Sequence, residues 1–389
     1  MSILLRRFIT AASCLFVLLT LAIVGCSSRT PDSEASPNAG DATSGAPDET
    51  TSEKVAAPLP TDPSDAVAAI EAVTTKMRRD GNGLIIEVDF RGTEVTDAAF
   101  EPLSQLPRLR SVLLGGTTIS DDSLKPIGQI ATLENLDLRD CPIGDAGLEH
   151  LTGLTKLKAL RLSGKSGDCE VSDDGMESVA KLGNLKVLAI DFLWVSEDGL
   201  SLITGLANLQ ELYMAGTTIG DDAIDVISAF PKLKKLRVAG TGIGADGLKH
   251  LPKLTGLEEL DMSECSQILD DAVAPIAEMK SLKKLNMWRL NLSDQGVEPL
   301  QGLTQLQWLN LDNTRLTDAG MPYLSDLTNL KFLHLGSTLI TDAGLEHLEG
   351  LKSLEDLKVT RTAVTQTGVD DLKAKLPDTE IQLKYIEGQ

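Results

Sequence analysis

Aromatic and basic residues are both scarce in this sequence. It has three Trp, three Tyr and seven Phe among 389 residues, so any core must be mainly aliphatic. It has 36 Lys and Arg against 57 Asp and Glu, which gives a formal net charge of −21 at pH 7. A chain with so little positive charge is poorly suited to neutralise phosphates. The composition therefore argues against nucleic acid as a partner.

What the sequence has is a 24-residue unit in twelve copies. The clearest copy, residues 330–353, is LKFLHLGSTLITDAGLEHLEGLKS. Nine of the eleven intervals between copies are 24 residues, and the other two are 28, with an insertion at residues 165–170, and 25, with Gln267 extra. The copies begin at Ile85, Leu109, Leu133, Leu157, Leu185, Leu209, Leu233, Leu257, Leu282, Leu306, Leu330 and Leu354. Positions are numbered below from these first residues.

Each unit predicts one strand and one short helix. Residues 330–335 alternate apolar and polar, as in a strand with one buried face. A helix begins at Thr341 and Asp342, with Leu345 and Leu348 on one inward face. Such a unit buries its apolar side only by stacking on its neighbours, with all strands parallel. The sequence therefore predicts one continuous α/β solenoid over residues 85–389, although the length alone would allow two or three domains.

The pattern LxxLxLxxTxITDAGLxxLxxLxx resembles the leucine-rich repeat family. The ITDAGL half is most similar to the cysteine-containing subclass, and Cys141 and Cys265 stand at position 9, where most other copies have Thr. The resemblance implies a parallel sheet on the concave side and short helices outside, in about twelve repeats. Proteins of the cysteine-containing subclass often act as ubiquitin-ligase adaptors. That role is not expected here, because no F-box-like helical segment precedes the repeats and the N-terminus predicts export.

Residues 1–25 predict a signal peptide. Arg6 and Arg7 precede an uncharged, mostly apolar run at residues 8–24, and residues 23–26 resemble a bacterial lipobox with Cys26 as the lipidated residue. Ile and Val depart from the usual lipobox at its first two positions. The alternative is an uncleaved membrane anchor, since the run is nearly long enough to span. Both place the repeats outside the cytoplasm on a membrane, and Ser27 favours the outer membrane or cell surface.

The segments around the repeats predict a linker and two caps. Residues 26–63 nearly lack large apolar residues and are expected to be a disordered linker after the lipidated cysteine. Residues 64–84 are expected to form an N-terminal cap, with one amphipathic helix over 64–80 ended by Gly81-Asn82-Gly83. The alternation over residues 376–385, which includes Tyr385, predicts a last strand that closes the sheet.

No catalytic chemistry is evident in the repeats, where the acidic and the histidine residues each recur at one fixed position of the unit. Asp stands at position 13 in nine copies, where it is expected to cap the helix start and complement the helix dipole. A calcium-binding ladder of these carboxylates is the alternative. His150, His250 and His347 all stand at position 18, on the outer helix. No catalytic constellation, cofactor site or metal site is predicted.

Of the five cysteines, Cys14 lies in the predicted signal peptide and Cys26 is the predicted lipidation site. Three remain in the exported protein, an odd number that cannot all pair as disulfides. Cys265 is expected to be a buried position-9 residue. Cys141 and Cys169 lie in adjacent repeats, which leaves a disulfide between them open.

The predicted contact surface lies on the concave face, where positions 2, 3, 5, 7 and 8 project. Scarce aromatic residues gather there, and exposed aromatics usually mark contact. The rings at position 3 of two adjacent repeats are expected to lie side by side, flanked by Trp288, as a platform for a sugar face or a partner side chain. Phe192 and Tyr213 form a second, smaller group. The predicted ligand-binding residues are Trp288, Arg289, Trp308, Asn310, Asp312, Phe332 and His334.

Two functions follow from this surface. The first is a membrane-tethered, non-catalytic module that binds an envelope protein or glycan through its concave face. The second is a structural spacer in the cell envelope without a defined ligand, in which the aromatic side chains merely cover one another or a bend of the solenoid.

Overall fold

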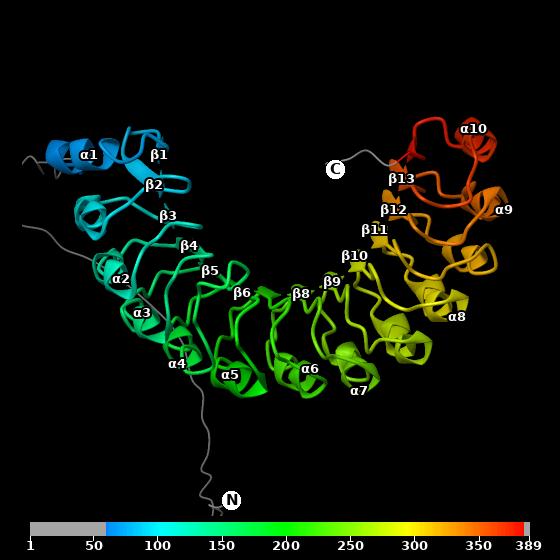
Figure 1. Cartoon of the computed structure of the whole chain (residues 1–389), viewed down its shortest axis with the longest axis horizontal. Coiled ribbons are helices and arrows are strands. Elements are labelled where there is room, and N and C mark those ends of the chain that lie inside the picture. The colour runs from blue at the N-terminus through cyan, green and yellow to red at the C-terminus, as the bar shows by residue number, and fades with distance from the viewer. Residues whose placement is uncertain (1–59, 385–389) are drawn as a thin grey trace, which may run out of the picture. The chain divides into compact units, whose positions relative to one another are not determined.

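The repeats form one continuous sheet. The computed structural model describes residues 60–384, so the predicted signal peptide, Cys26, most of the linker and Tyr385 lie outside the described residues. Fourteen strands are hydrogen-bonded in sequence order from β1 to β14. All neighbours from β2 onward are parallel, and Figure 1 shows the strands on the inner side of the array with the helices outside. The predicted α/β solenoid is confirmed.

The strands are three to five residues long and are separated by helical segments. The strands are β1 (Met77–Arg79), β2 (Ile85–Asp89), β3 (Ser111–Leu113), β4 (Asn135–Arg139), β5 (Ala159–Ser163), β6 (Val187–Asp191), β7 (Glu211–Tyr213), β8 (Lys235–Arg237), β9 (Glu259–Asp261), β10 (Lys284–Asn286), β11 (Trp308–Asn310), β12 (Phe332–His334), β13 (Asp356–Lys358) and β14 (Glu380–Gln382). The α-helices are α1 (Ser64–Glu71), α2 (Leu124–Ile127), α3 (Asp145–Glu149), α4 (Met176–Val179), α5 (Glu197–Leu202), α6 (Asp222–Ile227), α7 (Ala245–Leu248), α8 (Asp294–Val297), α9 (Asp342–Leu345) and α10 (Gln366–Lys375). Short 3-10 turns are η1 (Asp97–Ala99), η2 (Glu101–Gln105), η3 (Asp121–Ser123), η4 (Leu251–Lys253), η5 (Asp270–Ala272), η6 (Ala274–Glu278), η7 (Glu298–Gly302), η8 (Met321–Leu324) and η9 (Glu346–Leu348). No helix of residues 60–384 is long and apolar enough to cross a membrane.

Strand register follows the repeat register. In β12, Leu333 is fully buried while Phe332 and His334 on either side are half-buried on the opposite face, because strand side chains alternate. Leu333 pairs with Leu309 of β11 and Leu357 of β13. Leucines in equivalent positions form one buried cluster that runs the length of the array. The concave face therefore displays positions 3 and 5 of successive repeats in two parallel rows.

The N-terminal cap differs from the prediction of one helix over residues 64–80. Helix α1 ends at Glu71, and β1 pairs antiparallel with β2. The β-branched run at residues 73–75 disfavours helix, and the Thr74 hydroxyl donates to Asp89 O (2.8 Å). Gly83, at φ 84°, closes a turn between the two strands instead of ending a helix. The last residues of the expected linker are also ordered, because the Asp62 side chain accepts from Ile85 N (2.7 Å). At the other end, β14 pairs parallel with β13 as predicted.

The recurrent aspartates at position 13 join repeats rather than cap their own helices, which corrects the capping prediction. The two Asp318 carboxylate oxygens accept from the Thr341 backbone N–H (2.8 Å) and hydroxyl (2.7 Å) of the following repeat. Thr341 at position 12 is the residue that caps α9, through a bond from Ala343 N. Asp145, Asp173, Asp270, Asp294 and Asp342 make the same pair of bonds to the next Ser or Thr.

Glycine at position 15 makes room for this joint. A Cβ on Gly344 would lie 2.5 Å from Asp318 Oδ1, far inside contact distance. Eight joints combine Asp at position 13 with Gly at position 15 of the next repeat. Where the preceding residue is Glu197 or Ala245 instead, the next repeat has Ala223 or Ala272 in place of Gly. The letters T, D and G of the ITDAGL motif are therefore parts of one inter-repeat contact.

The calcium-ladder alternative is not supported, because these carboxylates already accept protein hydrogen bonds. Within residues 60–384, no three His, Cys, Asp or Glu side chains gather in a metal-binding arrangement. Cys141, Cys169 and Cys265 are buried free thiols, so Cys141 and Cys169 form no disulfide. Cys141 Sγ instead donates to Leu114 O (3.3 Å), and burial raises the pKa of Cys169 to about 11.

Because one hydrophobic core runs through all the repeats, we expect residues 60–389, produced alone, to fold and unfold as one solenoid. Spectroscopic melting and limited proteolysis would check this. The insertion at residues 165–170 is the natural test point. Two stable fragments separated there would show two independent units instead.

Candidate functional site on the concave face

The predicted ring pair is present on β11 and β12. The Trp308 and Phe332 rings stack with centroids 4.9 Å apart and 5° between their planes, as expected for the same position on paired strands. Their outer faces are covered too, by Lys284 Nζ 4.7 Å from the Trp308 centroid and Lys358 Nζ 5.6 Å from that of Phe332. The two rings thus lie side by side as predicted. Because both of their outer faces are covered by lysines, they do not form the open platform that was expected for a sugar face.

Trp288 does not flank the pair. Lys284, which pairs with Trp308 in register, holds that place, because Trp288 lies at position 7, beyond the end of β10. Trp288 is covered by the Arg289 guanidinium, 5.3 Å from its ring centroid. Arg289 is itself engaged in an ion pair with Glu264 (2.6 Å). These two residues form a separate contact at the strand ends.

The polar members of the predicted surface lie next to the ring pair. Asn310 Oδ1 accepts from Asp312 N (2.9 Å), and His334 Nε2 lies 4.0 Å from Asp312 Oδ1. The imidazole packs edge-on to Phe332, with centroids 6.3 Å apart. Burial lowers the pKa of His334, although Asp312 opposes that shift, so the ring is neutral at pH 7.

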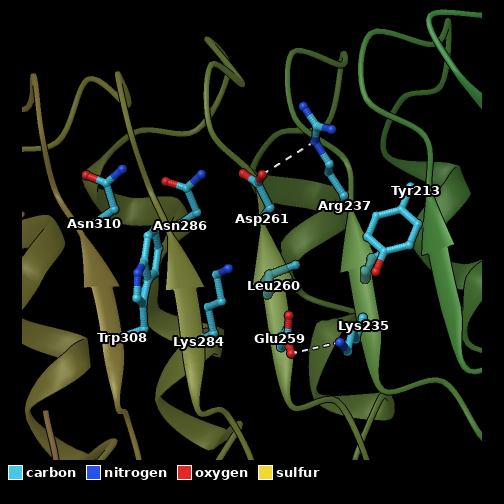
Figure 2. Close-up of a pocket in the computed structure, with 11 residues that line it drawn as sticks. Tyr213, Lys235, Arg237, Glu259, Leu260, Asp261, Lys284, Asn286, Trp308 and Asn310 are labelled. Atoms are coloured by element: carbon cyan, nitrogen blue, oxygen red, sulfur yellow. Dashed lines mark ion pairs between the residues drawn. The ribbon is translucent and has the colours of Figure 1, made fainter. Parts of the chain in front are cut away.

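A cavity of about 470 Å³ lies on the concave face beside the ring pair. It crosses five neighbouring strands, β7 to β11, from Tyr213 at one end to Trp308 at the other (Figure 2). At ~4.8 Å per strand, these ends are roughly 19 Å apart along the sheet. The lining residues are Tyr213, Lys235, Leu236, Arg237, Glu259, Leu260, Asp261, Lys284, Asn286, Trp308 and Asn310.

Alternating charges hold the middle of the cavity floor in place. Lys235 Nζ lies 3.5 Å from Glu211 and 3.2 Å from Glu259, and its hydrogen bond to Glu259 raises its pKa. Arg237 lies 3.5 Å from Asp261 in the next row (Figure 2). These networks pre-organise donors and acceptors along the floor, which lowers the ordering cost of binding.

The Tyr213 end of the cavity is also fixed by a hydrogen bond. The phenol donates to Glu211 Oε2 (2.7 Å), and burial is the main reason that its pKa rises above the usual value. Tyr213 thus links the second aromatic group of the sequence to the same cavity as Trp308, while Phe192 is not among the lining residues.

Most of the residues that line the cavity were not predicted from the sequence. The pattern that could have predicted them is at positions 3 and 5 of three consecutive repeats, which hold only charged or amide side chains around a buried Leu. This pattern does not stand out in the sequence, because other repeats also carry charged residues at these positions. The missed residues are Lys235, Arg237, Glu259, Asp261, Lys284 and Asn286.

Comparison with known proteins agrees with the fold. Two family models described as leucine rich repeat match residues 304–364 and 129–151. An internalin, InlF, from Listeria monocytogenes is similar in structure, with a TM-score of 0.56 and 19% identity over 84% of this chain and 96% of that one. This likeness concerns the fold alone. No curated protein matches the sequence.

Two further solved structures are more distant. Internalin C2 from the same organism has a TM-score of 0.41 and 23% identity, over 48% of this chain and 75% of that one. A TDR receptor has a TM-score of 0.48 and 17% identity, over 74% of this chain and 48% of that one.

Proposed function

We propose that this leucine-rich-repeat solenoid is a non-catalytic binding module that takes an envelope protein or a glycan on its concave face. The observation that carries the proposal is the cavity between Tyr213 and Trp308, pre-organised by ion pairs and walled by a half-buried tryptophan. Its floor offers paired charges and amides, which suit recognition more than acid–base chemistry.

The proposal includes a tether outside the cytoplasm. Cys26 is the proposed lipidation site after removal of residues 1–25, with the outer membrane or cell surface as the location. The residues that follow up to about residue 60 would then separate the solenoid from the membrane. The support is the lipobox-like sequence at residues 23–26.

We also assign the repeats to the cysteine-containing type. At position 9, the Cys141 and Cys265 thiols donate to a carbonyl of the preceding repeat, Leu114 O (3.3 Å) and Val238 O (3.1 Å). Thr338 at the same position donates within its own repeat, to Leu335 O (2.6 Å). Cysteine at this position therefore ties two repeats together where threonine closes one turn.

The alternative, a spacer without a ligand, is favoured by one observation. Trp308 and Phe332 cover each other's faces, so their exposure alone does not require a partner.

Trp308→Ala should separate these functions. Loss of a central anchor typically costs ~2 kcal/mol or more of binding, about thirty-fold in affinity. Loss of the ring stack should cost only ~1 kcal/mol of folding stability. We therefore expect recovery of partners from envelope extracts to fall sharply, with a small change in melting temperature.

Trp194→Ala is the matched control. This tryptophan is 72% exposed and does not line the cavity. It should leave both partner recovery and melting unchanged. If Trp308→Ala lowers the melting temperature while recovery stays at the wild-type level, the rings serve the fold and the spacer function is the better one.

A further inference from the structure

The β10–β11 end of the cavity presents two amide groups whose orientation is fixed. Asn286 and Asn310 are paired in register on adjacent strands and lie side by side in Figure 2. Their Oδ1 atoms accept from the backbone N–H two residues ahead, that of Trp288 (3.2 Å) and that of Asp312 (2.9 Å). This assigns the oxygen of each amide and leaves each Nδ2 without a protein partner among residues 60–384. Two N–H₂ donors are thus free to contact a ligand.

The fold does not require an amide at this position. In other repeats Asp stands there and makes the same local bond: Asp89 accepts from Arg91 N (2.9 Å), and Asp261 accepts from Ser263 N (3.1 Å). Only the oxygen is needed for that bond. Asn286 and Asn310 therefore replace a negative oxygen by a donor in two successive repeats, at the end of the cavity.

A third donor lies beside them. Lys284, also in β10, places its ammonium over the Trp308 ring and has no carboxylate within ion-pair distance among the described residues, unlike Lys235 with its two glutamates. Three cations and two carboxylates line the cavity, in a chain whose formal net charge is −21. This end of the cavity is thus a donor-rich site in an acidic protein.

We propose that this site binds a carboxylate of the ligand, and that the ligand is an acidic glycan containing carboxylated sugars; this deepens the proposed binding function and rests on it. The ammonium of Lys284 and the amides of Asn286 and Asn310 supply charge-assisted and neutral hydrogen bonds to the carboxylate oxygens. The indole of Trp308 walls the same space.

The remainder of the cavity favours a glycan over an acidic peptide. Its floor alternates donors and acceptors, Lys235 with Glu259 and Arg237 with Asp261, which matches hydroxyl groups that both donate and accept. Its apolar members Leu236 and Leu260 are almost fully buried, so the floor offers no apolar pocket for a peptide anchor. The length of roughly 19 Å suits an extended chain of several sugars.

The test is calorimetric titration of the purified full chain with short oligomers of galacturonate, glucuronate, mannuronate and guluronate, their methyl esters, and hexaglutamate. At least one free oligouronate should bind about tenfold or more tighter than its methyl ester, because the ester loses the charge-assisted bonds. Hexaglutamate should not compete.

Asn286→Asp with Asn310→Asp is the decisive variant. It keeps both local oxygen acceptors, as Asp261 does in its own repeat, so melting should be unchanged. It should weaken oligouronate binding by about tenfold or more, since it sets two carboxylates against the ligand's carboxylate. Lys284→Gln should weaken binding in the same sense. Asn291→Asp, exposed and outside the cavity, adds the same kind of charge and should have little effect.

Several results would overturn the inference. Absence of binding by all four oligouronates, equal binding of acid and ester, or wild-type affinity of the double variant would each do so. Competition by hexaglutamate, lost in the double variant, would assign the site to an acidic peptide instead. The proposed function would survive these results if Trp308→Ala still reduces partner recovery, so the two failures are distinguishable.

Discussion

Replacing Gly344 by Ala should lower the free energy of unfolding by about 2 kcal/mol or more, although it adds a single methyl group. The new Cβ would lie 2.5 Å from Asp318 Oδ1. Relief requires the carboxylate to move, and movement breaks its bonds to the Thr341 N–H and hydroxyl. Denaturant unfolding of the purified protein measures the change.

Gly350→Ala is the control for this prediction, because its Cβ would meet nothing nearer than an atom 4.0 Å away. It should be neutral or slightly stabilising. Asp318→Ala should also destabilise, by leaving the Thr341 donors unpaired.

The double change Asp318→Ala with Gly344→Ala should cost less than the sum of the two single changes. The chain already contains the corresponding pair, Ala245 with Ala272, at another joint. Additive costs, or a harmless Gly344→Ala, would show that the carboxylate and the glycine act independently.

Replacing Cys26 by Ala should abolish membrane retention or block processing of the exported chain. The proposed anchor is a lipid on this thiol, and alanine has no atom to carry it. Mass spectrometry of the mature wild-type protein should find an acylated Cys26 at the N-terminus.

Cys14→Ala is the matched control, since Cys14 lies within the proposed signal peptide and should be removed with it. It should leave retention unchanged. A wild-type protein that still begins at Met1 would contradict lipidation and favour the uncleaved anchor.

The repeat architecture was predictable from sequence because each 24-residue unit carries its own burial pattern. Leu333 and its equivalents fix the register of the whole sheet, so one copy predicts the others. The cap outside the repeats has no second copy from which its structure could be predicted. Residues 77–79 continue an apparent helical stripe, but they form a strand because they pair with the edge of β2. The local sequence pattern cannot predict this pairing, since the edge of β2 exists only in the assembled sheet.

The candidate site was predictable only in part, for a geometrical reason. The sequence placed Trp308 and Phe332 in neighbouring strands, and their contact is confirmed. Which ring faces remain open depends on the next strands, where Lys284 and Lys358 cover them. The cavity is a property of five strands together. Its first and last lining residues, Tyr213 and Asn310, are 97 positions apart in the sequence (310 − 213), so no local pattern brings them together.

The aspartate joint has a consequence for how such a chain changes length. A repeat with Asp at position 13 and Gly at position 15 carries the acceptor for the next joint and the room for the previous one. Duplication or deletion of such a unit between neighbours of the same kind therefore leaves each junction complete. The last repeat has Thr365 and Gly368 but Gln366 in place of the acceptor. A further unit stacked on the last repeat would therefore lack the aspartate bond at this joint, as the repeat after Ala245 does within the array.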